Sequence, residues 1–98
     1  MDNLDDIVRQ EMFDDVFMTR KKLLDLLDRI ATIENVDHRR DLIKMAGNLG
    51  CRIDDFSRSQ VECRHLGKVT GLYGTLKETV DREFSDIEGF LMVAILMD

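Results

Sequence analysis

Apolar side chains recur at helical spacing along most of this 98-residue chain, and that spacing limits its fold more than any other feature. When successive residues of segment 12–31 are rotated by about 100°, the apolar positions fall within one broad stripe. The stripe comprises Met12, Phe13, Val16, Phe17, Leu23, Leu24, Leu27, Ile30 and Ala31. This segment therefore predicts an amphipathic helix, although the charged Arg20 falls at the centre of the stripe.

The chain contains no proline, which permits long uninterrupted helices. Proline would remove a backbone N–H and clash with the preceding helical turn. Hydrophobic residues make up 44% of the chain and charged residues 35%, a balance typical of one small folded domain rather than a disordered tail. We therefore expect residues 1–98 to form a single all-α domain, a small bundle of four to five helices.

The first helix boundary is predicted near the N-terminus. The apolar positions of residues 3–9 point almost opposite to the stripe of residues 12–31. Such a reversal predicts either a separate short helix or a bend near residues 9–11, which would let the two segments cover different neighbours.

A second helix is predicted over residues 38–49. Asn35 and Asp37 are suitable N-cap residues just before it, because their side chains can accept hydrogen bonds from the first free backbone N–H groups. Gly50 suits the position after its end, since glycine adopts the left-handed conformation that closes many helices. Residues 51–55 would then connect it to the next helix.

The third helix is predicted to be the longest, over about residues 57–83. Ser57 and Gln60 have the spacing of a capping box at its start. Its apolar positions alternate three and four residues apart, which is typical of a helix packed along another helix. They are Leu66, Val69, Tyr73, Leu76, Val80 and Phe84. Three glycines within residues 67–74 conflict with this helix, and we favour a continuous helix over a turn there.

The last helix is predicted over residues 86–97, with Ser85 and Glu88 as a second capping box. Residues 90–97 are apolar on every side, so this helix should be buried or should meet a partner. These residues could simply complete the core, or they could continue into a dimer seam. The candidate partner-binding residues of that seam are Phe90, Leu91, Val93 and Ile95.

Charge and cysteine usage predict a cytoplasmic protein. The N-terminus is acidic where a signal peptide would be basic, and the two cysteines suit a reducing compartment. The longest uncharged apolar stretch, residues 89–97, is about half of what a membrane span needs. We therefore expect a soluble protein that does not bind membranes.

Catalytic and metal-binding patterns are weak, so we expect neither an enzyme nor a cofactor. The chain lacks a nucleophile elbow and a phosphate-binding loop. No zinc-site spacing is matched by Cys51, Cys63, His38 and His65.

The primary hypothesis is a non-catalytic interaction module, a small acidic adaptor, inhibitor or regulator. Its partner would be another protein or a second copy of the chain, as a homodimer.

A first alternative is a nucleic-acid-binding regulator. The net charge is −6, but residues 38–68 carry +3. Around Ala46 and Gly50 this segment resembles a helix-turn-helix over about twenty residues, with two misfits. Its candidate phosphate contacts are Arg52, Arg58, Arg64 and Lys68. The acidic charge of the whole chain opposes this hypothesis.

A second alternative is an inhibitor that mimics nucleic acid. Six acidic residues occur among the first fifteen, and they would present carboxylates to a basic partner protein. The candidate residues are Asp5, Asp6, Asp14 and Asp15. A solvated acidic helix face is the simpler interpretation of the same pattern.

Overall fold

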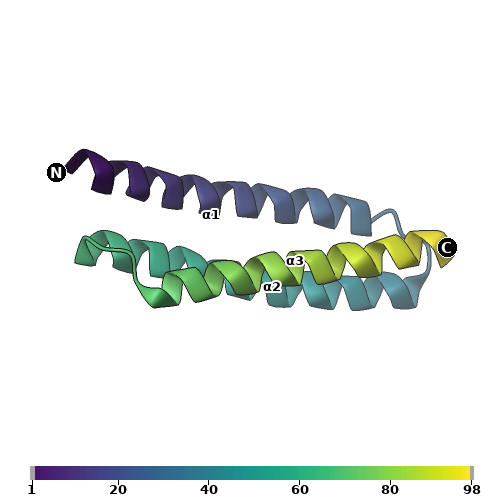
Figure 1. The fold of residues 1–98 in the computed structure, drawn as a ribbon. Coiled ribbons are helices and arrows are strands. Elements are labelled where there is room, and N and C mark those ends of the chain that lie inside the picture. The colour runs from purple at the N-terminus through teal and green to yellow at the C-terminus, as the bar shows by residue number, and fades with distance from the viewer. Residues whose placement is uncertain (1, 98) are drawn as a thin grey trace.

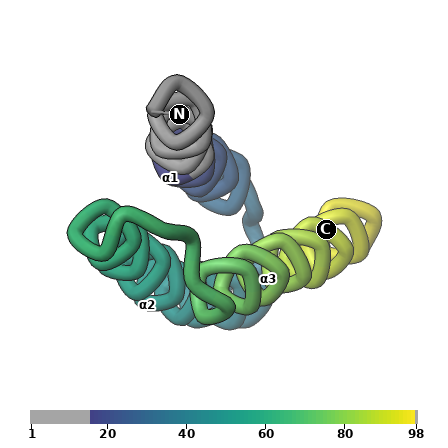
Figure 2. Tube along the Cα trace, turned by 60° about the vertical axis from the view of Figure 1, so that its left-hand side comes forward, coloured from purple at the N-terminus to yellow at the C-terminus, as the bar shows by residue number. Residues whose placement is uncertain are grey.

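The computed structural model describes the backbone of residues 2–97 and the side chains of residues 16–97. Across that range it contains helices α1 (Asp2–Ile30), α2 (Val36–Leu66) and α3 (Gly71–Met97), and no strand. The chain reverses direction at each connection, so α2 runs antiparallel to both neighbours (Figure 1). α1 lies on one side of the pair formed by α2 and α3 (Figure 2). The result is a rod of 54 × 18 × 15 Å.

Each helix buries a narrow stripe of side chains, most of which follow one another at intervals of three or four residues. The fully buried members are Val16, Leu26 and Ile30 on α1, Leu42, Ala46, Leu49, Ile53, Phe56 and Cys63 on α2, and Tyr73, Val80, Phe84, Ile87, Leu91 and Ala94 on α3. This is the spacing of helices packed along one another. The Phe56 and Tyr73 rings stack at 4.8 Å between centroids, which joins α2 to the start of α3.

The prediction of four to five helices is wrong, because predicted boundaries fall inside continuous helices. α1 passes through residues 9–11 without a break, and it contains neither glycine nor proline that would end it. α2 passes through Gly50. A Cβ built there would meet the Leu23 side chain at 3.8 Å, so this glycine lies at a helix contact rather than at a helix end. The predicted connection at residues 51–55 is likewise helical.

Neither predicted capping box starts a helix. Ser57 and Gln60 lie within α2, and Ser85 and Glu88 lie within α3. The predicted helix over residues 57–83 is therefore wrong, since its first part ends α2 and its second part begins α3. The predicted separate helix over residues 86–97 is the C-terminal part of α3. A serine and a glutamine or glutamate three residues apart also occur in helix interiors, where tertiary packing decides the outcome.

The glycines of residues 67–74 mark the turn that we disfavoured. Gly67 has φ 71° and ψ 18°, the left-handed conformation that ends a helix. Its N–H donates to the Arg64 carbonyl at 3.3 Å, and the N–H of Lys68 donates to the Cys63 carbonyl at 3.2 Å. The Thr70 N–H then donates to the Cys63 thiol sulfur at 3.4 Å. These bonds close α2 and direct the chain into α3.

The other connection confirms Asn35 as the N-cap of α2. Its side-chain oxygen accepts a hydrogen bond from the His38 N–H at 3.0 Å, while Asp37 lies in the first turn of the helix. The Arg39 guanidinium donates to the Ile33 carbonyl at 3.1 Å, which ties the connection to α2. Both connections are short, which explains why consecutive helices are antiparallel neighbours.

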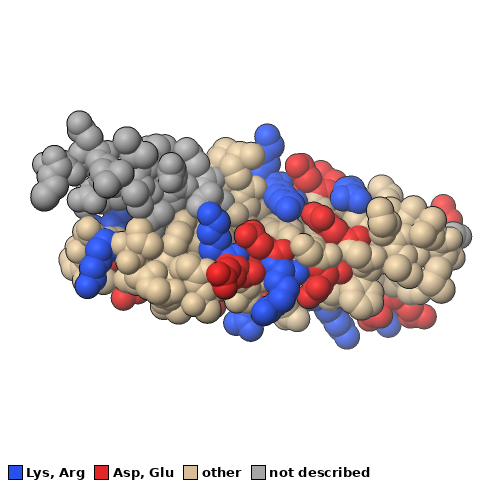
Figure 3. Space-filling model, in the orientation of Figure 1, with Lys and Arg blue, Asp and Glu red and all other residues tan. Residues whose placement is uncertain are grey.

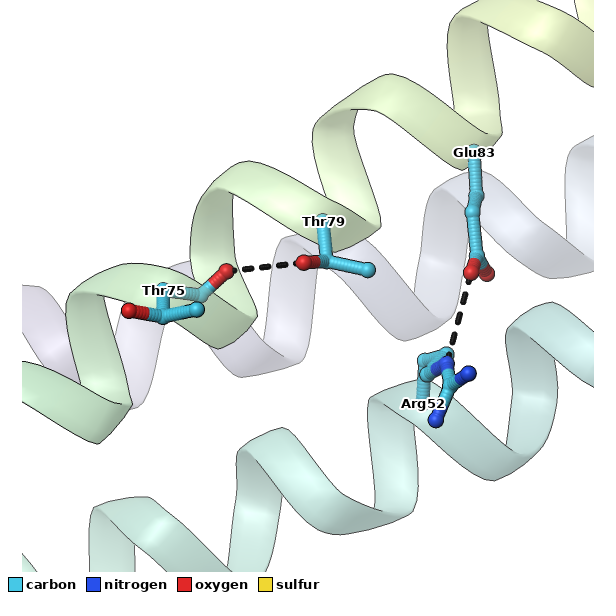
Figure 4. A network of polar contacts seen from close by, with 4 residues as sticks. All are labelled: Arg52, Thr75, Thr79 and Glu83. Atoms are coloured by element: carbon cyan, nitrogen blue, oxygen red, sulfur yellow. Dashed lines mark hydrogen bonds and ion pairs between the residues drawn. The ribbon is translucent and has the colours of Figure 1, made fainter.

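Polar contacts between helices lie at the surface of the rod. Arg52 of α2 pairs with Glu83 of α3 at 3.4 Å (Figure 4). Lys22 of α1 reaches Glu88 of α3 at 3.6 Å and lies 4.8 Å from the centroid of the Phe84 ring. Pairs this exposed contribute at most about 1 kcal/mol each. The buried apolar stripe therefore provides most of the attraction between helices.

We expect Gly67→Ala to destabilise the protein by about 1–2 kcal/mol, because a Cβ is strained in the left-handed conformation. Gly47→Ala is the matched control. Gly47 lies within α2 and a Cβ there would meet nothing within 4 Å, so alanine should stabilise the protein by about 0.5–1 kcal/mol. Urea denaturation of both variants measures the difference. Equal effects of the same sign would contradict the assignment of Gly67 as the helix end.

Candidate interaction surface

The C-terminal part of α3 carries six large apolar side chains that are each at least half exposed. They are Phe90, Met92, Val93, Ile95, Leu96 and Met97, and we call them the α3 apolar surface. Leu96 is the most exposed of them, at 82% of its full accessible area. Charged side chains are sparse over this end of the molecule in Figure 3. No charged residue occurs between residues 89 and 97.

This surface exists because the segment is apolar on every side while the bundle covers only one side of α3. Among residues 90–97, only Leu91 and Ala94 point into the core. Both continue the buried stripe of α3, four and seven residues after Ile87. A helix in a three-helix bundle buries about one third of its circumference, so the remaining apolar positions stay in contact with solvent.

A groove of about 370 Å³ adjoins the α3 apolar surface. It lies between the N-terminal half of α2 and the C-terminal part of α3. Its lining residues are His38, Asp41, Leu42, Met45, Phe90, Val93 and Ala94. Phe90 and Val93 therefore belong both to the exposed surface and to the wall of the groove. A side chain that enters the groove would contact mostly apolar atoms.

The structure separates the four predicted seam residues into two groups. Phe90, Val93 and Ile95 lie on the surface, whereas Leu91 is completely buried in the core. Leu91 is thus a packing residue of the monomer and not a part of the exposed surface. Met92, Leu96 and Met97 were missing from the prediction. The one sequence feature that could have identified them is that they belong to the segment 90–97, which is apolar on every side.

A second groove, of about 480 Å³, lies between α1 and α2. Leu23 and Leu24 of α1 and the glycines Gly47 and Gly50 of α2 line it, together with Arg20. The position of Arg20 explains why a charge falls within the predicted apolar stripe. The buried stripe of α1 is narrower than the sequence suggested, and Arg20 lies outside it, exposed beside this groove.

The structure gives no support to a helix-turn-helix, because α2 is continuous where that motif would turn. It places Arg52, Arg58 and Arg64 on α2, and Lys68 in the connection to α3. The three arginines are six residues apart, so successive side chains point about 120° apart around the helix. They therefore form no single basic face. Arg52 also pairs with Glu83, and Arg58 with Asp55.

The acidic candidates Asp5, Asp6, Asp14 and Asp15 lie outside the residues whose side chains the structure describes. Their presentation to a basic partner stays a prediction. Within residues 16–97, no three histidine, cysteine or acidic side chains are arranged to hold a metal ion. Over the same part of the chain, none of the helices combines the length and hydrophobicity that crossing a membrane requires.

Comparisons with protein-family models, curated proteins and solved structures give no match for this chain.

We expect Leu91→Ala and Ile95→Ala to differ strongly in stability, although the two residues are four positions apart on one helix. Leu91→Ala should lower the free energy of unfolding by about 2–5 kcal/mol, because it leaves a cavity in the core. Ile95→Ala should change it by less than about 1 kcal/mol, because Ile95 is half exposed. Urea denaturation at low protein concentration makes the comparison. A similar loss in both variants would show that Ile95 is also a core residue.

Proposed function

We propose that this chain is a non-catalytic interaction module, a small adaptor, inhibitor or regulator that binds another protein chain through the α3 apolar surface. The observation that carries this proposal is the extent of that surface. Large apolar side chains expose roughly 150–200 Å² each when fully free, so the six exposed fractions together correspond to roughly 600–750 Å². The largest apolar patch of an ordinary monomer is about 300–600 Å².

The size of the surface suits a protein partner. One partner of a standard protein–protein complex contributes about 800 Å². The adjoining groove adds a recess into which a large side chain can insert, and such anchored side chains carry much of the binding energy in many interfaces. An extended apolar face beside an apolar recess therefore supports recognition of an amphipathic helix or a similar apolar segment.

No observation on the described residues specifically favours either alternative function, nucleic-acid binding or mimicry of nucleic acid. The arginines of α2 point in different directions, and two of them pair with acidic side chains. The acidic N-terminal segment stays a hypothesis that rests on sequence alone. The interaction module is the function that the geometry supports best.

A test compares binding by matched charge variants. Phe90→Glu and Leu96→Glu each place a carboxylate on the α3 apolar surface without touching the core. Val61→Glu is the control, because Val61 is equally exposed but lies on α2, outside this surface. Circular dichroism checks that all three remain helical.

The chain and its variants are immobilised and incubated with a cell extract of the source organism. In a separate assay they are incubated with a labelled copy of the chain itself. We expect at least one bound protein to be lost with Phe90→Glu and Leu96→Glu and retained with Val61→Glu, and then to bind the purified chain with the same pattern. Loss of a few kcal/mol per interface anchor makes binding undetectable in such an assay. If every variant binds the same proteins as the unaltered chain, and none is lost, the proposal is wrong.

A further inference from the structure

We infer that α2 and α3 together bind a basic amphipathic helix of another protein, which lies along the groove between them. This inference rests on the proposed function and specifies the chemistry of the partner. Its starting observation is that two separate recesses open between the same two helices. The first is the groove of about 370 Å³ beside Phe90, and the second, of about 310 Å³, is lined by Glu62. We call them the Phe90 groove and the Glu62 groove.

The two grooves are aligned so that one straight helix can occupy both. Met45 lines the Phe90 groove and Ser59 lines the Glu62 groove, fourteen residues further along α2. Fourteen residues complete almost four helical turns, so the two side chains point in nearly the same direction and lie about 21 Å apart. A helix of about 20 residues is about 30 Å long and therefore spans both grooves.

α1 does not fill this position. It lies on one side of the pair formed by α2 and α3 (Figure 2), and no described residue of α1 lines either groove. The Arg52–Glu83 ion pair joins α2 to α3 between the two grooves (Figure 4). Because this pair is already neutral, a partner helix needs only a small or polar side chain at that level.

The charges that line the grooves favour a cationic partner. Arg58 is the only lysine or arginine among the described lining residues, and it is already paired with Asp55. Asp41 in the Phe90 groove and Glu62 in the other are both exposed. Neither forms an ion pair with another described residue. Lysine or arginine side chains of a partner would therefore find two carboxylates without a counter-charge.

Apolar walls beside these carboxylates make the partner amphipathic. Phe90 and Val93 are more than half exposed in the Phe90 groove, and so is Leu72 in the Glu62 groove. An amphipathic helix with apolar residues on one face and basic residues at its edges satisfies both features. A second copy of this chain is a poor match, because the chain is acidic and its apolar segment 89–97 carries no lysine or arginine.

Two synthetic peptides of about 20 residues, the length that spans both grooves, test the chemistry of the occupant. Both have the same stripe of leucines on an alanine-rich helix, and the positions beside the stripe are lysines in one peptide and glutamates in the other. Fluorescence anisotropy of the labelled peptides measures binding to the whole chain. We expect the lysine peptide to bind at least about tenfold more tightly than the glutamate peptide, and to lose affinity as salt is added.

Charge variants locate the binding site. Asp41→Asn and Glu62→Gln should each weaken binding of the lysine peptide by about twofold to tenfold, because each removes one carboxylate that faces an ammonium group. Asp54→Asn is the matched control. Asp54 is also an exposed carboxylate of α2, but it lines the groove toward α1, so its replacement should leave the affinity unchanged.

A matched pair of valines tests the apolar contact. Val93→Ser should weaken binding of the lysine peptide by at least about fivefold, because Val93 lines the Phe90 groove. Val61→Ser should not, since Val61 is similarly exposed on α2 but lines neither groove. Circular dichroism checks that all variants remain helical.

Three results would each overturn the inference: lysine and glutamate peptides that bind equally or not at all, equal weakening by Asp54→Asn and Glu62→Gln, or equal weakening by Val61→Ser and Val93→Ser. Self-association that Val93→Ser abolishes, without binding of the lysine peptide, would assign the grooves to a second copy instead. The proposed function survives each result if Leu96→Glu still abolishes capture of a protein, because Leu96 lines neither groove.

Discussion

The buried stripe of α2 is the constraint on which the rest of the structure depends. Among the residues that the structure describes, α1 and α3 each pack mainly on α2 and hardly on each other. Between α1 and α3, Lys22 reaches Glu88 and the Phe84 ring, and an opening of about 410 Å³ lies beside this contact. Leu49 and Ile53 of α2 are almost completely buried in the core that the three helices share. A break in α2 at residue 50 would divide that stripe, so continuity through the glycine is required for a three-helix rod.

The amino-acid sequence predicts the all-α class correctly, but it predicts the number of helices and their ends poorly. Stripes with alternating spacing of three and four residues correctly indicated an all-α fold, and they contained Ile30, Phe84 and other core residues. Gly50 and Gly67 look alike in the sequence, yet one packs inside a helix contact and the other ends α2 in the left-handed conformation. The neighbour that a Cβ at Gly50 would meet, at 3.8 Å, is Leu23, which lies far away along the chain. Local signals cannot include that contact.

The sequence predicted which segment would carry the candidate surface, but it did not predict which side of the helix would be exposed. Because residues 90–97 are apolar on every side, the sequence indicated that they need more cover than a small bundle provides. It could not indicate which side meets the core, since periodicity vanishes where every position is apolar. The rotation of α3 is fixed upstream, where Tyr73, Val80 and Phe84 pack on α2. That rotation carries Leu91 inward and leaves Leu96 in solvent.

The arrangement in which chain neighbours are also spatial neighbours has a consequence for folding kinetics. Each packed pair, α1 with α2 and α2 with α3, is joined by a connection of four or five residues. Forming either pair requires the closure of one short loop, so little chain entropy is lost before apolar contacts compensate for it. Helical proteins with such local topology fold in microseconds to milliseconds. Because α2 is common to both pairs, either hairpin can form first and provide the surface on which the remaining helix docks.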